Sequence, residues 1–574
     1  SASGKVDWFG QKIVLTSPEY EVLQASADQQ TNLHTGRLVP VYSETSGLSS
    51  KWLRGRIAYV LEQSLPLVQE QLPDEILRVQ HLMGLREAIQ TIHFPPTLEA
   101  ARLARERLAF DELFMLVLRA QQQKLAWKTT LRSLSFRVNA EQKNTFITHL
   151  PFTLTPDQVT AINECLTDME QSVPMNRLLE GDVGAGKTVV AAAGMYAAWC
   201  QGISSVLLAP TQILAAQHAA TLRNILEKPH GIPVYLLLGG SSKKNANQTL
   251  AGPGIFVGTH ALLEPSVNLP PLGLIVIDEQ QRFGVRQRAI LRQQTDSKDM
   301  AHQLTMTATP IPRTIAQTVF GNLDMSVLRT LPTGRKPVKT WVVPKEKRMA
   351  AYEWIKKELT TTHSQAFIIC PFIDESETLK TVKAATSEFA VLKTIFAPLR
   401  VNLLHGRMKN EEKTKALERL HDRKDDILVA TPVVEVGIDI PEATIMVIEA
   451  AERFGLSQLH QLRGRVGRRE KSSYCLLFTE QESPEVITRL KALETEHSGP
   501  LLAELDLALR GPGELFGTRQ HGLPGFTLAT LSDTKLVDRV KRAVTSLTRV
   551  DPQLTRFPLL RERLEESKIE SIQS

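Results

Sequence analysis

The sequence has few cysteines and no long apolar run. Its 574 residues include four cysteines, Cys165, Cys200, Cys370 and Cys475, which lie far apart without a CxxC pair or a His/Cys cluster. This spacing argues against a zinc site and indicates reduced thiols in an intracellular protein. No apolar run reaches the roughly 18 to 20 residues that a membrane-spanning helix needs, and SASGKVDW at the N-terminus lacks a signal-peptide pattern. We therefore expect a soluble protein with no membrane partner.

Aromatic residues and net charge are also low. Aromatic residues make up 6% of the chain, and Lys+Arg 68 against Asp+Glu 62 leaves a formal charge of +6. This mild basic balance permits a polyanionic partner but is equally compatible with ordinary solubility. The hydrophobic and charged fractions, 42% and 23%, are typical of soluble globular proteins and exclude disordered and fibrous classes. A length of 574 residues predicts about four domains of roughly 150 residues each.

Short apolar runs that alternate with helical patterns dominate the middle of the chain. A first series is VLLAP, GIFVGT and LIVIDE, and a second, after the linker at 334–337, is AFIIC, VNLLHG, ILVATP and IMVIEA. Such alternation is typical of parallel sheets covered by helices. The sequence therefore predicts an α/β protein with two lobes in tandem, at 146–336 and 337–490.

The flanking segments have different patterns. Residues 1–24 contain one short alternating stretch, which we interpret as the remaining edge of a larger sheet. Residues 25–145 are predicted to form a helical connector, because apolar residues such as Leu98, Ala101 and Ala104 recur at spacings of three and four. The tail, 491–574, is mixed and carries a Gly/Pro-rich segment that starts at Arg510.

A glycine-rich loop in the first lobe matches the pattern that binds phosphate groups. The phosphate loop, as we call residues 181–188, consists of Gly181, Asp182, Val183, Gly184, Ala185, Gly186, Lys187 and Thr188. A short predicted strand precedes this loop and a predicted helix follows it, so a simple glycine turn before a core helix is the weaker interpretation. Backbone N–H groups would bind phosphate oxygen atoms, Lys187 would reach the β/γ-phosphates, and Thr188 would ligate Mg²⁺.

Two further groups of residues complete a predicted nucleotide hydrolysis site. Asp278, at the end of an apolar strand, would hold the Mg²⁺ shell, and Glu279 would orient or deprotonate the attacking water. Gln461, Arg465 and Arg468 lie on a glycine-containing turn in the second lobe, from which the arginines would neutralise charge on a triphosphate. A site divided between two lobes is the design of a motor. A GTP switch is disfavoured because we find no guanine-reading motif.

Several motifs together resemble one family. They are PFTLTPDQ, GDVGAGKT, LLAPTQILAAQH, DEQQRFGVRQR, MTATPIPRT, LHGRMK, ATPVVEVGIDIPEAT and AERFGLSQLHQLRGRVGR. The chain is similar to the superfamily 2 helicases and, through RFGV, TPIPRT and ERFGLSQLHQLRGR, to the RecG branched-DNA translocases. The resemblance covers nearly the whole chain. It implies two RecA-like lobes, ATP with Mg²⁺, double-stranded and branched DNA as partner, and a helical hairpin and loop in the tail.

The resemblance also implies roles for individual residues. Gln158 would read adenine, with Phe152 supporting the same pocket, and Thr307, Thr309 and Glu435 would couple the nucleotide to DNA. The residues implied in contact with DNA are Thr211, Gln212, Thr259, His260, Arg407 and Thr431 in the lobes, and Arg510 and Arg519 in the tail. Judged alone, each of these has an ordinary structural interpretation, as a core aromatic, a polar cap or a surface arginine.

Two departures from the family pattern stand out. Gln281 occupies the position where the family usually has histidine, and it cannot carry a proton charge near neutral pH. The family also carries an N-terminal OB-fold wedge, of which residues 1–24 would be the final piece. Two alternative functions remain open: a transcription-repair coupling translocase, and a DNA-binding scaffold that uses nucleotide only as a structural ligand. The resemblance further implies a monomer, single-stranded DNA-binding protein as a partner, and the bacterial cytoplasm near the nucleoid, with organellar residence left open.

Overall fold

The computed structural model consists of two compact units. The residues that it describes are 2–10, 12–20, 33–34, 37–45, 47–238, 252–259, 262, 267, 269–279, 299–309, 323–330, 336–371, 388–431, 440, 442–467, 471–481, 483–510 and 533–573. Described residues before Lys124 and from Asp533 onward form one unit, and those from Lys124 to Arg510 form the other. Within the described part of the chain, no helix is both long and apolar enough to cross a membrane.

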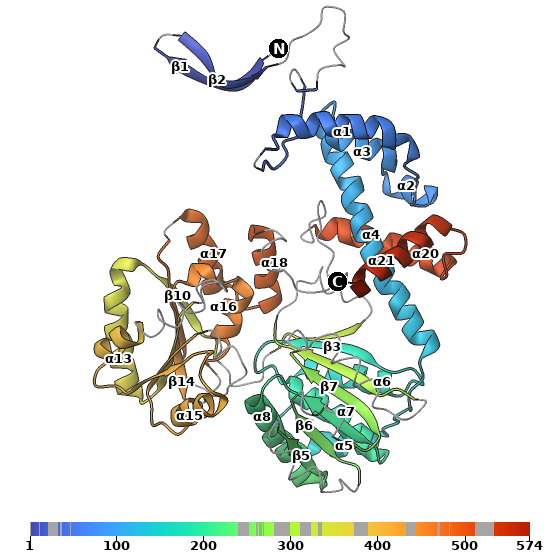
Figure 1. Cartoon of the computed structure of the whole chain (residues 1–574). Coiled ribbons are helices and arrows are strands. Elements are labelled where there is room, and N and C mark those ends of the chain that lie inside the picture. The colour runs from blue at the N-terminus through green and yellow to red at the C-terminus, as the bar shows by residue number, and fades with distance from the viewer. Residues whose placement is uncertain are drawn as a thin grey trace, which may run out of the picture. The chain divides into compact units, whose positions relative to one another are not determined.

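The first unit joins residues from both ends of the sequence. Its elements are an antiparallel hairpin, β1 (Ala2–Phe9) and β2 (Lys12–Tyr20), and the helices α1 (Ser50–Ser64), α2 (Asp74–Gln80), α3 (Leu85–His93), α4 (Leu98–Thr130), α20 (Thr534–Val550) and α21 (Pro558–Gln573) (Figure 1). Arg539 of α20 donates to Glu106 of α4 at 2.5 Å and to the carbonyl oxygen of Gln80 at 2.6 Å. Arg563 of α21 contacts Asp111 of α4 at 2.9 Å. These ion pairs bind the tail helices to the predicted helical connector.

The first lobe of the second unit is built on a seven-stranded parallel sheet in the order β5-β6-β4-β7-β8-β3-β9. Its strands are β3 (Asn176–Gly181), β4 (Ser204–Leu208), β5 (Val234–Leu237), β6 (Ile255–Gly258), β7 (Leu272–Asp278), β8 (His302–Thr307) and β9 (Asp324–Leu328), and its helices include α5 (Ala140–Thr148), α6 (Pro156–Met169), α7 (Lys187–Cys200), α8 (Gln212–Leu222) and α9 (Lys228–His230). Val206 and Leu208 of β4 belong to one buried cluster, whereas Leu207 belongs to another. Both faces of the sheet are therefore covered, which explains why its strands read as continuous apolar runs.

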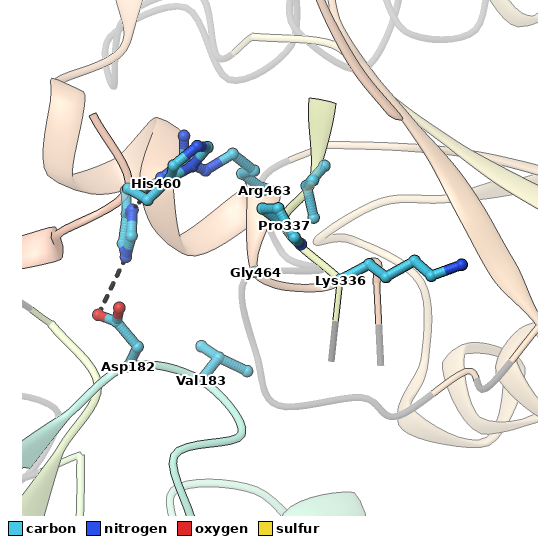
Figure 2. Close-up of a pocket in the computed structure, with 9 residues that line it drawn as sticks. Asp182, Val183, Lys336, Pro337, His460, Arg463 and Gly464 are labelled. Carbon is cyan, nitrogen blue, oxygen red and sulfur yellow. Dashed lines mark hydrogen bonds and ion pairs between the residues drawn. The ribbon is translucent and has the colours of Figure 1, made fainter. Parts of the chain in front are cut away.

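The second lobe is built on a six-stranded parallel sheet in the order β10-β15-β14-β11-β13-β12. Its strands are β10 (Lys339–Val343), β11 (Gln365–Ile369), β12 (Val401–Leu404), β13 (Ile427–Ala430), β14 (Ala443–Ile448) and β15 (Tyr474–Phe478), and its helices include α13 (Arg348–Thr362), α15 (Asn410–His421), α16 (Leu456–Arg463), α17 (Pro484–Thr495) and α18 (Gly499–Arg510). The end of α16 lies beside Asp182 and Val183 of the first lobe (Figure 2). The predicted α/β fold with two parallel-sheet lobes is confirmed, whereas the exact domain boundaries stay predictions.

Helix α7 explains why the phosphate loop is held against the first sheet. Every residue of α7 from Val189 to Ala198 is buried, and most of these side chains are small. A Cβ atom added to Gly194 would lie 3.0 Å from Cδ2 of Leu274 on β7, so a larger residue there would require the Leu274 side chain to move. The alanine-rich composition thus sets a short distance between helix and sheet.

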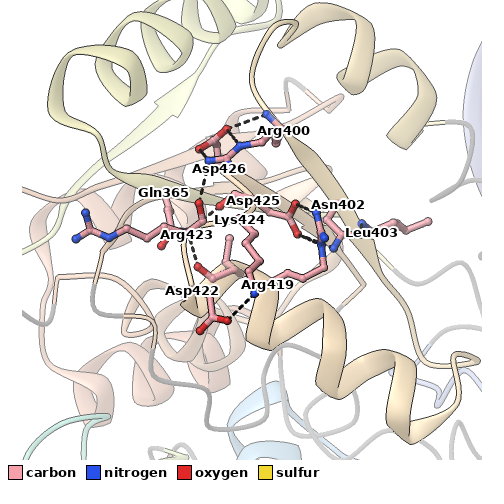
Figure 3. A network of polar contacts seen from close by, with 11 residues as sticks. Gln365, Arg400, Asn402, Leu403, Arg419, Asp422, Arg423, Lys424, Asp425 and Asp426 are labelled. Atoms are coloured by element: carbon pink, nitrogen blue, oxygen red, sulfur yellow. Dashed lines mark hydrogen bonds and ion pairs between the residues drawn. The ribbon is translucent and has the colours of Figure 1, made fainter.

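A network of charged side chains lies at the amino ends of β11, β12 and β13 in the second sheet (Figure 3). Asp425 has a side chain only 3% exposed, and it accepts hydrogen bonds from Arg419 at 2.8 and 3.0 Å and from Asn402 at 2.8 Å. Its neighbour Asp426 accepts from Arg400 at 2.8 and 3.0 Å. The charge-rich turn between α15 and β13 is exposed at residues 421–424, and Asp425 and Asp426 fix its end to α15 and to the start of β12; we call this network the Asp425 clasp.

Removal of the Asp425 carboxylate should weaken this clasp. We expect Asp425→Ala to lower the local stability of β12 and β13 by about 2 to 3 kcal/mol, less than for a fully buried pair because the Arg419 side chain is 52% exposed. Hydrogen exchange of peptides from both strands measures this loss. Asp422→Ala is the matched control, since Asp422 pairs with Lys424 at the surface and should leave the exchange rates of both strands close to those of wild type. Equal changes in hydrogen exchange in the two variants would contradict a stabilising role for the Asp425 carboxylate.

Candidate functional site

The phosphate loop connects the end of β3 to the start of α7. Gly184 and Gly186 have φ angles of 83° and 86°, in the left-handed region that glycine adopts without strain. A Cβ atom added to Gly186 would lie 2.2 Å from Nε2 of Gln158, and one added to Gly181 would lie 3.0 Å from Cβ of Leu328. The loop is thus a tight backbone turn at a helix N-terminus, where N–H groups and the helix dipole favour an anion.

Lys187 is the first residue of α7, and its ammonium group lies within its own loop. Nζ donates to the carbonyl oxygen of Gly181 at 2.6 Å and to that of Asp182 at 3.2 Å. Burial lowers the pKa of Lys187, whereas the carboxylates of Asp278 and Glu279 act in the opposite direction. The charge of Arg465, in the second lobe, also acts to lower this pKa.

The acidic pair lies at the carboxyl end of β7. Asp278 is buried, and its Oδ2 is 2.8 Å from Nε2 of His218 on α8. Burial alone would raise the pKa of Asp278, but the hydrogen bond and charge of His218, together with Lys187, hold this pKa below its usual value. Asp278 is therefore an ionised carboxylate in a buried position, the ligand chemistry that Mg²⁺ prefers.

Glu279 connects the acidic pair to the predicted coupling loop. Its backbone has a φ of 51°, an unusual value for a residue other than glycine. Its Oε1 accepts a hydrogen bond from the backbone N–H of Ala308 at 3.2 Å. On either side of Ala308, the hydroxyl groups of Thr307 and Thr309 lie 3.2 Å apart. A movement of the loop at 307–309 would therefore change the position of the Glu279 carboxylate.

Gln158 has two local structural roles, of which only the capping of α6 can be read from the Thr155-x-x-Gln158 spacing. Its Nε2 donates to the carbonyl oxygen of Ala185 in the phosphate loop at 2.9 Å, and its Oε1 accepts from the N–H of Thr155 at 2.8 Å. The second bond is half of a capping box that begins α6. Both ends of the amide therefore have protein partners, and adenine recognition by Gln158 stays a prediction. Phe152, which is 47% exposed, retains an accessible ring.

The second lobe contributes the end of α16 and the turn that follows it. Gln461 and Arg465 are buried. Nε2 of His460 is 3.0 Å from Oδ1 of Asp182, which joins the lobes at the phosphate loop (Figure 2). Burial would raise the pKa of Asp182, but His460, Lys187 and Arg463 hold it below its usual value.

A small cavity beside this contact has a volume of about 80 Å³. It is lined by Asp182, Val183, Lys336, Pro337, Val338, His460, Arg463, Gly464 and His497. Pockets for nucleotide-sized ligands are several times larger, about 300 Å³ or more, so this cavity is not the nucleotide pocket.

The residues predicted to contact DNA follow the carboxyl ends of strands. Thr211 caps α8 by accepting from the N–H of Leu214, and Gln212 and Arg407 are exposed. Thr259 and Thr431 are buried directly after β6 and β13, where a structural role fits them better than a phosphate contact. Arg510 is the last residue of α18. His260, Gln281, Glu435, Arg468 and Arg519 lie outside the described residues. The DNA contacts therefore stay predictions.

Sequence patterns alone did not identify three residues of the site. His218, His460 and Arg463 fall inside the motifs LLAPTQILAAQH and AERFGLSQLHQLRGRVGR, but neither motif indicates a role for them. A single histidine within a helical pattern carries no recognisable signal on its own. Only the fold places His218 next to Asp278 and His460 next to Asp182.

Comparison with known proteins gives a consistent result. Residues 155–318 match the DEAD/DEAH box helicase family, and residues 350–470 match the helicase conserved C-terminal domain. The chain is 42% identical over 571 residues to the ATP-dependent DNA helicase RecG of Synechocystis sp., covering 98% of this chain and 68% of the relative. It is 39% identical to that of Thermotoga maritima, covering 92% and 67%. A solved structure of RecG bound to a three-way DNA junction aligns with a TM-score of 0.74 at 34% identity, covering 95% of this chain and 70% of the other.

The tight turn at Gly186 can be tested directly. We expect Gly186→Ala to weaken nucleotide binding at least about 10-fold, because the left-handed backbone costs roughly 1 to 2 kcal/mol and the new methyl group would displace the Gln158 amide. Titration with a fluorescent ATP analogue measures the affinity. Gly202→Ala is the control: Gly202 has a φ of 72° but no atom near its added Cβ, and it lies outside the loop. Unchanged affinity in Gly186→Ala, or an equal loss in Gly202→Ala, would show that the turn does not shape the phosphate site.

Proposed function

Since the chain belongs to the RecG family of ATP-dependent DNA helicases, we propose that it hydrolyses ATP to translocate on double-stranded DNA and to remodel branched DNA, such as stalled replication forks and Holliday junctions. One structural observation supports this proposal independently of the family comparison. The phosphate loop of the first lobe is hydrogen-bonded to the second lobe through Asp182 and His460, and Gly464 of the second lobe packs against Val183 of the loop. A nucleotide in this loop would therefore face groups from both lobes, as a motor requires.

The residues of the site fit ATP and Mg²⁺. Backbone N–H groups of the phosphate loop and the Lys187 ammonium would bind the β- and γ-phosphates. The Thr188 hydroxyl and the ionised Asp278 carboxylate would hold Mg²⁺, which, when bound, neutralises part of the phosphate charge. Glu279 would orient the attacking water. Gln461, Arg465 and Arg468 would face the phosphates from the second lobe.

The DNA partner follows from the relatives. A RecG structure is described as bound to a three-way DNA junction, and we extend this substrate class to the present chain. Thr211, Gln212 and Arg407 are the described candidates for phosphate contacts. A monomeric state, single-stranded DNA-binding protein as a partner, and residence in the bacterial cytoplasm remain predictions. A transcription-repair coupling role is not favoured, because the similar curated proteins are RecG helicases.

Substitution of Lys187 separates a motor from a scaffold. We expect Lys187→Ala to reduce ATP turnover about 100-fold or more and to abolish fork remodelling, because the cation at the phosphates is lost. Binding to a model fork should persist. The assays are steady-state ATPase without DNA, with single strand, with linear duplex and with a fork, together with fork regression, all at a stated salt concentration.

Lys357→Ala provides the control, since Lys357 is exposed on α13. It should behave as wild type in every assay. Fork remodelling that survives in Lys187→Ala would identify the chain as a scaffold and would refute the proposed function.

A further inference from the structure

A relay of three side chains connects the phosphate loop to the frame of the second lobe. Asp182 of the loop contacts His460 at 3.0 Å, and Nδ1 of His460 is 2.8 Å from the NH2 nitrogen of Arg463 (Figure 2). The NH1 nitrogen of Arg463 donates to the carbonyl oxygen atoms of Leu493 and Glu496 at 2.8 and 3.0 Å. The side chains of His460 and Arg463 are buried, so water competes little with these contacts.

The chemistry of arginine fixes the direction of each hydrogen bond. A guanidinium has donors only, so Nδ1 of His460 accepts from Arg463. Nε2 of the neutral imidazole must then carry the proton and donate it to the Asp182 carboxylate. Both ring nitrogens are therefore used, and the ring is held in one orientation.

The same helix end makes a second close approach to the phosphate loop. A Cβ atom added to Gly464 would lie 3.3 Å from Cβ of Val183, so the absence of a side chain allows the two backbones to approach. The N–H of Arg465 donates to the carbonyl oxygen of Leu462 at 3.0 Å, which continues the turn after α16. The second lobe thus contacts the loop at two residues, His460 and Gly464, and Arg465 is the residue after Gly464.

We propose that His460 is a positioning residue for ATP hydrolysis: by bonding Asp182 while held by Arg463, it sets where Arg465 meets the phosphate loop. This inference rests on the proposed function. His460 touches no phosphate itself. Nucleotide binding depends mainly on the first lobe, whereas the second-lobe arginine acts on the reacting phosphate. Loss of His460 therefore reduces turnover and leaves ATP affinity nearly unchanged.

The first experiment separates turnover from binding in the full chain. We expect His460→Ala to lower kcat about 10- to 100-fold, the loss that corresponds to one hydrogen bond with a charged partner, while KM for ATP stays within about 3-fold. His460→Gln should recover most of kcat, because one amide offers both a donor for Asp182 and an acceptor for Arg463. His497→Ala is the matched control, since His497 lines the same cavity but does not take part in the relay.

The second experiment needs no nucleotide. Hydrogen exchange of a peptide that covers residues 177–190 should become faster in His460→Ala and return toward wild type in His460→Gln, because the relay restrains the loop of the nucleotide-free protein. Adding Asp182→Ala to His460→Ala should slow turnover no further than the more severe single variant, since both remove the same contact.

Three outcomes would overturn the inference. The first is a decrease in kcat in His460→Ala no larger than in His497→Ala, and the second is a rise in KM for ATP with kcat unchanged. The third is a His460→Gln variant with a kcat as low as that of the alanine variant. These outcomes are distinct from failure of the proposed function, which would appear as wild-type protein without DNA-stimulated ATP turnover while the exchange difference at residues 177–190 persists.

Discussion

The interaction on which the site depends is the contact of one partly buried lysine with the carbonyl oxygen atoms of its own loop. The Lys187 ammonium loses part of its hydration, and it is kept in place by the carbonyl groups of Gly181 and Asp182 and by the nearby carboxylates of Asp278 and Glu279. Removal of a cation from water is expensive unless it is paired and hydrogen-bonded. A polyphosphate would provide much stronger compensation than the loop carbonyls, so the loop is prepared to exchange internal hydrogen bonds for bonds to an anion.

The topology of the sheet brings the partners of this lysine together. In a parallel sheet all carboxyl ends lie at one edge, and β8 lies between β3 and β7. The phosphate loop, the acidic pair and the Thr307–Thr309 loop therefore meet although they are far apart in sequence. The hydrogen bond from Ala308 to Glu279 is the most direct sign of this convergence.

The sequence was most informative where chemistry and local structure coincide. The glycines and Lys187 of the phosphate loop, and the acidic pair after an apolar run, were recognisable because each motif constrains its own backbone. Gln158 shows the limit of this approach: its capping of α6 follows from the Thr155-x-x-Gln158 spacing, but its support of the phosphate loop depends on a contact with Ala185 that spacing does not reveal. The roles of His460 and Arg463 could not be predicted from the sequence for another reason: their partners come from a different lobe or a different helix. The ion pair between Arg539 of the tail and Glu106 of the connector could not be predicted either, because its two residues are far apart in the sequence.

The small residues of α7 also affect the site at a distance. Gly194 faces Leu274 near the middle of β7, whereas Lys187 opens the same helix two turns earlier and Asp278 ends the same strand four residues later. The small buried side chains of α7 therefore contribute to the spacing between Lys187 and Asp278, although they lie outside the phosphate loop. Mutations that enlarge these side chains would act as catalytic mutations without any change in the catalytic residues, and a survey of inactive variants should find some of them in the core.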